Sequence, residues 1–395
     1  MPESSPECTD LENPDAAIAA PAPPSWCGFE RGWIISRYAD IVSVLRTRAV
    51  RSADPGIELS RFALRAGRRH DDLQAVLAGT QLFQDGDRHR RTRMMVRRFV
   101  AELRARWTPD RMRETMALAL SDVPLGSVVD IVPALADRLS GTIIADALGL
   151  EFEHVRRLRH DGHAVMALWR PAPPARDYAR LDTLCRHMHD GLAAHAAPGG
   201  SLSCLHTGDD ADTVSDLAFW LATSGGDSVT GTFAAALDIV ARDQAMQERL
   251  RRAPGLISGF VREVLRLAGP LRRLTRRIAT APIRLGETTV RPGEGMILHI
   301  ERAHRDPGAF VAPDCLDPTR TAPPLLAFGG GAHACQGSEL GVLQAEMMIE
   351  AVLAHVSVHG TETRGRLLPQ RDLRQFASLP LRLLPLDHRN RSGPA

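Results

Sequence analysis

The chain has 395 residues, of which 44% are hydrophobic, so it is long enough to bury a large core. Its formal net charge of +2 is close to neutral, which argues against a protein that binds nucleic acid or a membrane surface as a whole. All 49 basic residues are arginine, a bias that points to a GC-rich, bacterial genome.

Residues 1–32 predict a disordered tail. This stretch is rich in Pro, Ala, Ser and acidic residues, and it lacks the basic and apolar regions of a signal peptide. No apolar run in the chain reaches the roughly 18 residues that a membrane helix needs. We therefore expect a cytoplasmic protein with no membrane contact.

The remaining elements follow in chain order. A short strand is expected around 33–36, and apolar spacing at Ile41, Val44 and Leu45 predicts a helix after it. From about 85 to 270 the pattern is mostly helical, with loops at 171–175 and 197–201. Alternation with turn signals predicts short strands between 277 and 300. A helix follows Cys335, and a strand-like piece ends near 386.

These elements indicate a mainly α fold with a small β-sheet, in a single domain over residues 33–385. Residues 386–395 are expected to be a C-terminal tail. The cysteines are scattered, with no C-x-x-C pair, so a zinc site is not expected. They are Cys8, Cys27, Cys185, Cys204, Cys315 and Cys335.

Cys335 stands apart because of its setting, "LLAFGGGAHACQG" (325–337). A thiolate that binds iron must be anionic and open on one side. The helix that begins just after Cys335 would direct its positive end at the sulfur, and a nearby cation would also favour the thiolate. The glycines allow a sharp turn against a large ligand. Phe328 could cover the sulfur, and His333 could donate a hydrogen bond.

The stretch "FGGGAHACQG" resembles the haem-binding loop of the cytochrome P450 family, F-G-x-G-x-H-x-C-x-G. Every fixed position matches, among them Phe328, Gly329, His333, Cys335 and Gly337. The alternative is a glycine-rich turn with an incidental cysteine. The resemblance extends over roughly 33–385, and it implies the P450 fold with haem b held by Cys335 as the metal ligand.

The segment "REVLR" supplies the family's E-x-x-R pair as Glu263 and Arg266. The pattern is weak by itself, since any helix can carry such a pair; its position before the Cys loop selects it. The family often has an arginine where this chain has Cys315, and that arginine joins the pair in a buried network. We expect the pair to persist with a different third member, which the sequence does not identify.

The resemblance also implies cations for the haem propionates. His89 and Arg93 lie four residues apart and so share a helical face, and Arg277 and His333 complete the set. Further arginines on the same helix are expected to be solvated. As a hypothesis, they form a docking surface for an acidic ferredoxin served by its own reductase. These arginines are Arg88, Arg90, Arg91, Arg97 and Arg98.

The long apolar helix over 215–240 is interrupted by Ser224, Gly225, Gly226, Asp227 and Ser228. This run resembles the family's central helix. By that resemblance, the glycines leave room for dioxygen and water, and the acid and alcohol relay protons. The family usually has threonine at the position of Ser228. The alternative is a core helix with a solvated Asp227.

The resemblance places Trp169, Leu221, Leu271, Arg272 and Phe376 at the substrate pocket. Arg272 or its neighbour Arg273 could bind a substrate carboxylate, although surface or propionate roles are the favoured alternative. Three functions compete. The first is a monooxygenase that hydroxylates or epoxidises a small organic molecule, such as a secondary-metabolite intermediate. The second is oxidative coupling or cyclisation without oxygen insertion, and the third is a non-catalytic partner protein.

Overall fold

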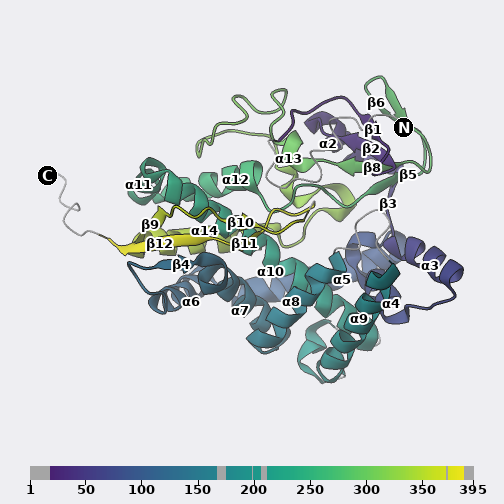
Figure 1. Ribbon diagram of the computed structural model, residues 1–395, viewed down its shortest axis with the longest axis horizontal. Coiled ribbons are helices and arrows are strands. Elements are labelled where there is room, and N and C mark those ends of the chain that lie inside the picture. Colours follow the sequence, from purple (N-terminus) through teal and green to yellow (C-terminus); the bar gives the residue numbers. More distant parts are fainter. Residues whose placement is uncertain (1–17, 167–174, 198, 206–210, 371, 387–395) are drawn as a thin grey trace.

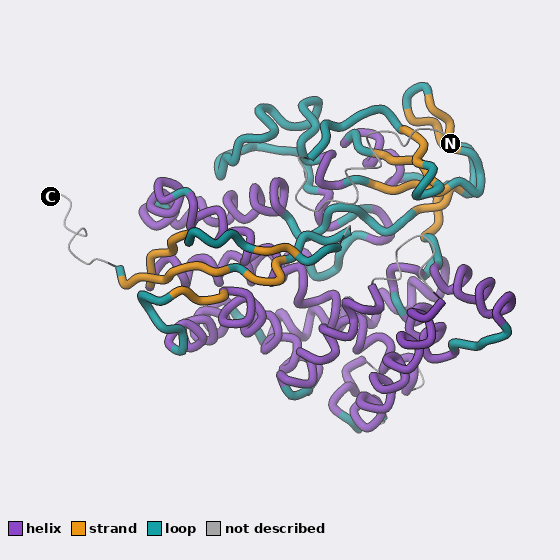
Figure 2. Tube along the Cα trace, viewed as in Figure 1, coloured by secondary structure: helices purple, strands orange, loops and turns teal. Residues whose placement is uncertain are grey.

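The computed structural model describes residues 18–166, 175–197, 199–205, 211–370 and 372–386. Within these residues the chain is mainly helical, with its strands gathered in two places at the upper right and at the left of the view (Figures 1 and 2). This arrangement confirms the predicted fold class.

Several helices begin at a capping residue. The side chain of Asp54 accepts a hydrogen bond from the backbone N–H of Gly56, and Thr108 does the same for Arg111. A proline takes the first helical position in both cases. The helices are α2 (Tyr38–Arg46), α3 (Pro55–Ala66), α4 (Asp71–Gly79), α5 (Gly86–Arg106), α6 (Pro109–Ser121), α7 (Asp137–Leu148), α8 (Phe152–Met166), α9 (Ala175–Ala196), α10 (Ala211–Arg242), α11 (Gln244–Arg252), α12 (Ile257–Ala268), α13 (Ile300–Ala303) and α14 (Ser338–His355).

Helix α10 runs through the middle of the molecule and packs against α7, α8, α9, α12 and α14 (Figure 1). Its side chains are buried on nearly every face, and Phe233 and Leu237 are fully buried. Burying a side chain of this size contributes roughly 1.5–3 kcal/mol. This burial offsets the cost of Gly225 and Gly226, about 1 kcal/mol each relative to alanine. In the described part of the chain, no helix is long and apolar enough to cross a membrane.

The larger sheet has five strands in the order β1-β2-β8-β5-β3. β2 and β8 pair in parallel, and the other neighbours are antiparallel. Its apolar residues pack with α2 in a separate small core that includes Ile35, Val44 and Met296. The strands are β1 (Ser25–Cys27), β2 (Gly32–Ile35), β3 (Val50–Ser52), β5 (Arg277–Ala279) and β8 (Gly295–Leu298), with the hairpin of β6 (Ile283–Leu285) and β7 (Thr288–Val290) beside them.

The second group of strands closes the C-terminal part of the chain onto the helices. The strand β12 pairs in antiparallel fashion with both β4 and β9, and β10 pairs with β11. The predicted strand ending near 386 is therefore confirmed. These strands are β4 (Val128–Asp130), β9 (Val356–Gly360), β10 (Arg366–Leu367), β11 (Phe376–Ser378) and β12 (Pro380–Pro385).

The N-terminal tail is shorter than the sequence predicts. Within residues 1–32, the stretch 25–27 is strand β1, which pairs with β2. Trp26 stacks edge-to-face on Trp33, and the buried carboxylate of Glu30 binds Arg273. The prediction is wrong because these contacts are made with residues outside the Pro- and Ala-rich stretch, so the composition of the stretch does not indicate them.

Candidate functional site

The loop over 325–337 folds back on itself and presents Cys335 to the interior. The backbone N–H of Cys335 donates to the carbonyl oxygen of Phe328 over 2.8 Å, which closes the loop. Gly329 and Gly331 have φ values of 66° and 61°, in the left-handed region that favours glycine. A Cβ atom at Gly331 would also collide with the carbonyl oxygen of Leu45 in α2. The backbone path therefore requires these two glycines.

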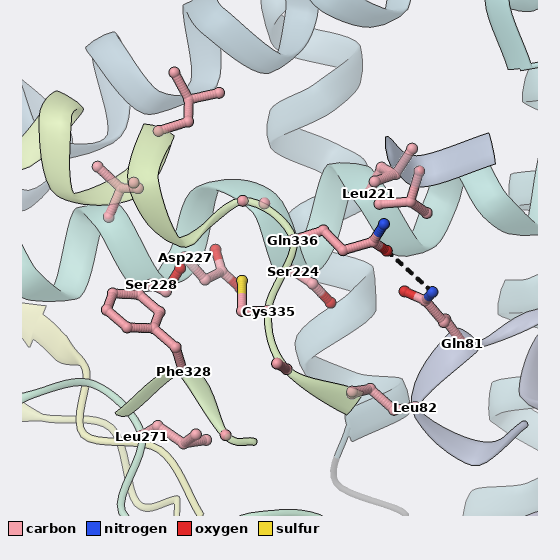
Figure 3. Close-up of a pocket in the computed structure, with 18 of the residues that line it drawn as sticks. Gln81, Leu82, Leu221, Ser224, Asp227, Ser228, Leu271, Phe328, Cys335 and Gln336 are labelled. Atoms are coloured by element: carbon pink, nitrogen blue, oxygen red, sulfur yellow. Dashed lines mark hydrogen bonds between the residues drawn. The ribbon is translucent and has the colours of Figure 1, made fainter. Parts of the chain in front are cut away.

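Cys335 lies in the wall of a cavity between this loop and α10 (Figure 3). Its side chain keeps accessible surface, and that surface faces the cavity. Burial raises the pKa of the Cys335 thiol, while a hydrogen bond from the backbone N–H of Gly337 and the charge of Arg93 act in the opposite direction. A bound metal cation would stabilise the anion.

Helix α5 holds the Cys loop on both sides of the sulfur. Arg93 Nη1 donates to the carbonyl oxygen of Ala334 over 2.9 Å, and Gln336 Nε2 donates to the carbonyl oxygen of Arg93 over 2.7 Å. Gln81 Nε2 then donates to Gln336 Oε1 over 3.2 Å (Figure 3). Arg93 can be identified from the sequence, but the two glutamines cannot, because no local pattern brings residues 81 and 336 together.

His89 and His333 stack beside the loop, with ring centroids 4.2 Å apart. His333 Nε2 also lies 3.2 Å from Ser52 Oγ and 3.4 Å from Asp85 Oδ1. Burial, aided by the neighbouring charges of His333 and Arg93, lowers the pKa of His89 to about 4. Its Nε2 atom is buried and has no hydrogen-bond partner among the described residues. An unpaired buried group costs roughly 1–3 kcal/mol, so His89 is suited to pair with a ligand.

Arg277 begins β5 and lines the same cavity. Its Nη1 atom donates to Ser52 Oγ over 3.0 Å and to Thr275 Oγ1 over 2.9 Å. Burial lowers the pKa of Arg277 to about 10, although the charge of Asp85 acts in the opposite direction. In the part of the chain that the structure describes, neither Arg93 nor Arg277 has an ion-pair partner.

The cavity therefore offers one thiol and two arginines, the buried Arg277 and the half-buried Arg93, that lack an ion-pair partner among the described residues. Its atom-free space is about 1930 Å³, including the open mouth. An iron porphyrin provides a metal for the thiolate, a broad ring for the apolar walls and carboxylates for the cations. The side chains of this site fit such a group.

Helix α10 forms the wall that faces the Cys loop (Figure 3). The residues of the predicted interruption that line the cavity are Ser224, Gly225, Asp227 and Ser228. Gly225 and Ser228 are the exposed members, and Asp227 is buried. Gly226 does not line the cavity, and a Cβ atom there would lie 3.2 Å from the guanidinium carbon of Arg159. The prediction that Gly226 makes room for dioxygen is therefore wrong, because this glycine makes room for Arg159.

Arg159 from α8 is a buried partner of Asp227 that sequence reasoning missed. Its Nε donates to Asp227 Oδ1 over 2.8 Å, and its Nη2 lies 3.2 Å from both Asp137 Oδ1 and Thr230 Oγ1. Burial acts to lower the pKa of Arg159, but the charges of Asp227 and Asp137 outweigh it and raise the pKa. Asp227 is thus an ion-paired carboxylate rather than the solvated residue of the alternative interpretation.

The rest of the cavity wall is mostly aliphatic. Leu221 and Leu271 line it as predicted, joined by Leu82, Leu274 and Leu373. Trp169 lies outside the described residues.

Arg272 and Phe376 do not line the cavity, so their predicted place in the pocket is wrong. Arg272 is buried with its Nε 2.8 Å from Glu301 Oε2, and Phe376 packs against Gly365. Arg273 is likewise buried in ion pairs with Glu30 and Asp372. These pairings explain the adjacent arginines without a substrate carboxylate.

The E-x-x-R pair is present and buried, with Arg266 Nε and Nη2 donating to Glu263 over 2.7 and 2.8 Å. Its third member is Arg320, whose Nε donates to Glu263 Oε2 over 3.1 Å. The side chain of Cys315 takes no part, but its carbonyl oxygen accepts from Arg266 and Arg320. The third member of the network therefore lies five residues after Cys315, in an irregular loop.

Comparisons with known proteins agree with this geometry. The family model for cytochrome P450 matches residues 236–383. A nocardicin C N-oxygenase from Nocardia uniformis subsp. tsuyamanensis is 28% identical, with 81% of each chain covered. A biotin biosynthesis cytochrome P450 from Bacillus subtilis is 25% identical, covering 89% of this chain and 90% of the relative. A solved structure of P450BioI with an acyl carrier protein has a TM-score of 0.79 at 22% identity, covering 91% and 94%.

Proposed function

The chain belongs to the cytochrome P450 family of oxidoreductases, and from this premise we propose that it is a haem-thiolate monooxygenase acting on a small organic molecule. We propose haem b as the cofactor, with Cys335 as the metal ligand. When bound, the haem supplies the activation of dioxygen. One oxygen atom enters the product and the other leaves as water, with two electrons from a donor protein and two protons.

One observation carries this proposal. A single cavity has the Cys335 thiol on one wall, Arg93 and the buried Arg277 beside it without an ion-pair partner among the described residues, and the Ser228 hydroxyl on the facing helix. A merely structural cysteine would not need a buried arginine such as Arg277 near it, since burying a charge without an ion-pair partner is costly. The arrangement instead supports one bound group that Cys335 ligates through its metal, that the arginines bind through its carboxylates, and to which Ser228 can donate a proton.

We assign the following roles to these side chains. Arg93, Arg277 and the histidines His89 and His333 bind the haem carboxylates. Phe328 lies at the start of the Cys loop and lines the cavity, where its ring limits water near the sulfur. At Ser228 the hydroxyl is open to the cavity and is available to donate a proton.

Asp227 is held by Arg159, so it can exchange protons with Ser228 only through movement of that pair or through water. Serine lacks the methyl group that restricts χ1 in threonine, so this hydroxyl is held less tightly than the family's threonine. We infer a proton path that is present but less firmly positioned.

The electron donor is proposed to be an acidic ferredoxin-type protein served by a separate reductase. Five exposed arginines lie over residues 88–98 of α5, and the same helix holds the Cys loop through Arg93. A positive surface next to the metal ligand favours a negatively charged partner. The exposed arginines are Arg88, Arg90, Arg91, Arg97 and Arg98.

The substrate is proposed to be an intermediate of secondary metabolism. A relative is named for N-oxygenation of nocardicin C, which supports oxygen insertion into such a molecule. Oxidative coupling or cyclisation is the second candidate, favoured by the ion-paired Asp227 and by serine at position 228. The names of the relatives are those of oxygenases and P450s, which gives no support to a non-catalytic partner protein.

The test is the absorption spectrum of the reduced protein under carbon monoxide, in the wild type and in Cys335→Ala. We expect a thiolate-type spectrum that the substitution abolishes together with activity. A colourless wild type after hemin reconstitution, or a Cys335→Ala variant that stays active, would contradict the proposal. Once a substrate is identified, the reaction can be run under ¹⁸O₂ and the mass of the product measured. Incorporation of ¹⁸O supports monooxygenation, and an unlabelled product supports coupling.

A further inference from the structure

Besides His89, two side chains in the cavity wall have a buried polar atom without a hydrogen-bond partner among the described residues. Gln375 is only 6% exposed, and no described group donates to its buried Oε1 atom. The indole Nε1 of Trp220 is also buried without an acceptor among the described residues. Both side chains line the cavity that contains Cys335. Unpaired buried groups are rare in proteins, and each one calls for an explanation.

The backbone holds Gln375 firmly in place. Its carbonyl oxygen accepts from the N–H of Leu368 over 2.8 Å, and the preceding Arg374 N–H donates to Pro270. A bridge between Leu271 and Leu373 fixes the adjacent cavity wall. The backbone at Gln375 is thus held by local contacts, while its side-chain oxygen has no donor among the described residues.

Trp220 begins a polar row along α10. Residues four apart share a helical face, so Trp220, Ser224, Ser228 and Thr232 lie on one side, and all four line the cavity. The Thr232 hydroxyl is already committed to the carbonyl oxygen of Ser228 over 2.7 Å. Trp220 therefore adds an N–H donor to the hydroxyls of Ser224 and Ser228.

Charged groups in the wall are otherwise accounted for. Asp227 is paired with Arg159, and the cations Arg93 and Arg277 lie by the Cys loop, where the proposed haem carboxylates would bind. The other titratable side chains that line the cavity, among the described residues, are Cys335 and the histidines His89 and His333 of the same loop region. The remaining surface can hydrogen-bond to a substrate but cannot neutralise an ionised one.

We propose that Trp220 and Gln375 are specificity-determining residues for a neutral, mainly apolar substrate that carries an amide or a similar donor–acceptor group. The Trp220 N–H binds an acceptor oxygen of the substrate, and Gln375 Oε1 accepts from a substrate N–H or O–H. This inference rests on the proposed haem enzyme and names the class of molecule that its cavity takes. Binding would give each group a hydrogen-bond partner.

A matched set of probes tests the inference on the haem-loaded enzyme. Dodecanamide, methyl dodecanoate and dodecanoate share an apolar chain but present a donor and acceptor, an acceptor only, and a charge. Their dissociation constants can be measured by calorimetry and by the change in haem absorption. For the wild type we expect the amide to bind tightest and the carboxylate weakest, with the amide ahead of the ester by roughly fivefold to tenfold.

The variants separate the two contacts. Gln375→Leu should abolish the preference for amide over ester, and Trp220→Phe should weaken both neutral probes by a similar factor. Leu271→Val, an apolar change in the same wall, should weaken all three probes equally and serves as the control. An unchanged amide-to-ester ratio in Gln375→Leu overturns the inference, as does tightest binding of the carboxylate or binding of none of the three by the wild type.

Stability provides an independent measurement. If Gln375 is kept for a ligand, Gln375→Leu in the ligand-free holoenzyme should unfold at the same temperature as the wild type or at a higher one. A clear drop in that temperature would mean that the amide serves the fold, and it would overturn the inference. A wild type without a thiolate-type spectrum would instead refute the proposed function, so the two failures are distinguishable.

Discussion

Replacing Arg320 with methionine tests the network that the structure assigns to Glu263. The change removes the bonds from the Arg320 guanidinium to three carbonyl oxygens of exposed residues, which water can replace; they belong to Val311, Ala312 and Cys315. It also removes one charge-assisted hydrogen bond to a buried carboxylate, the 3.1 Å contact from Arg320 Nε to Glu263 Oε2. Such bonds contribute roughly 1.5–3 kcal/mol. Glu263 keeps two bonds from Arg266 and one from the backbone N–H of Asp317, so it is not left unpaired. We therefore expect a loss of about 2 kcal/mol, below the roughly 3–5 kcal/mol for breaking a buried pair.

The loss should depend on pH in a defined direction. Burial acts to raise the pKa of Glu263, but hydrogen bonds from Arg266, Asp317 and Arg320 outweigh it and lower the pKa. A carboxylate with a lowered folded pKa stabilises the fold above its unfolded value, about 4.3, and loses that contribution as the pH falls through the folded pKa. Arg320→Met brings the folded pKa closer to the unfolded one, so its deficit should be full at neutral pH and shrink in acid.

Urea unfolding of the holoenzyme at several pH values measures this effect through the midpoint concentration. Cys315→Ala is the matched control, because only the carbonyl oxygen of Cys315 joins the network, and it should change stability by at most about 0.5 kcal/mol. The reasoning fails if Arg320→Met is as stable as the wild type, or if Cys315→Ala costs as much.

Three further outcomes are expected. Arg159→Met should lower the unfolding free energy by about 3–5 kcal/mol, because it leaves the buried carboxylate of Asp227 without its ion-pair partner. Adding Asp227→Asn should restore most of the lost stability. If the two substitutions instead lower the urea midpoint additively, the pairing is contradicted. Ser228→Ala should form roughly tenfold less product per reducing equivalent, and unchanged coupling would place proton delivery elsewhere. Reversing the charge of Arg90 and Arg91 should slow reduction by ferredoxin and weaken the salt dependence of the reduction rate, measured by stopped flow. Unchanged kinetics would contradict the proposed docking surface.

The docking experiment has a control of its own. Arg249 is exposed on α11, at the opposite side of the view in Figure 1 from α5, and its charge reversal should leave reduction unchanged. A similar slowing in this variant would show a general effect of net charge rather than a local surface.

The sequence by itself determined the Cys loop and the interrupted central helix. Both are local: the φ values of Gly329 and Gly331 require glycine, and Cys335 lies a few residues from the helix that follows it. The alternation of apolar and polar residues over 277–300 likewise predicts short strands, because this pattern involves only neighbouring residues. Motifs that are contiguous in the chain can be recognised before the fold is known.

Only the tertiary structure decided which distant side chains meet. Arg159 reaches Asp227 because α8 packs across α10, and Arg320 replaces the arginine expected at Cys315 because an irregular loop curls back to Glu263. Neither contact follows from a repeating pattern in the sequence. Both depend on how helices and loops pack in the folded chain. The unpaired amide of Gln375 is of the same kind, since burial and the absence of a partner are properties of the folded chain alone.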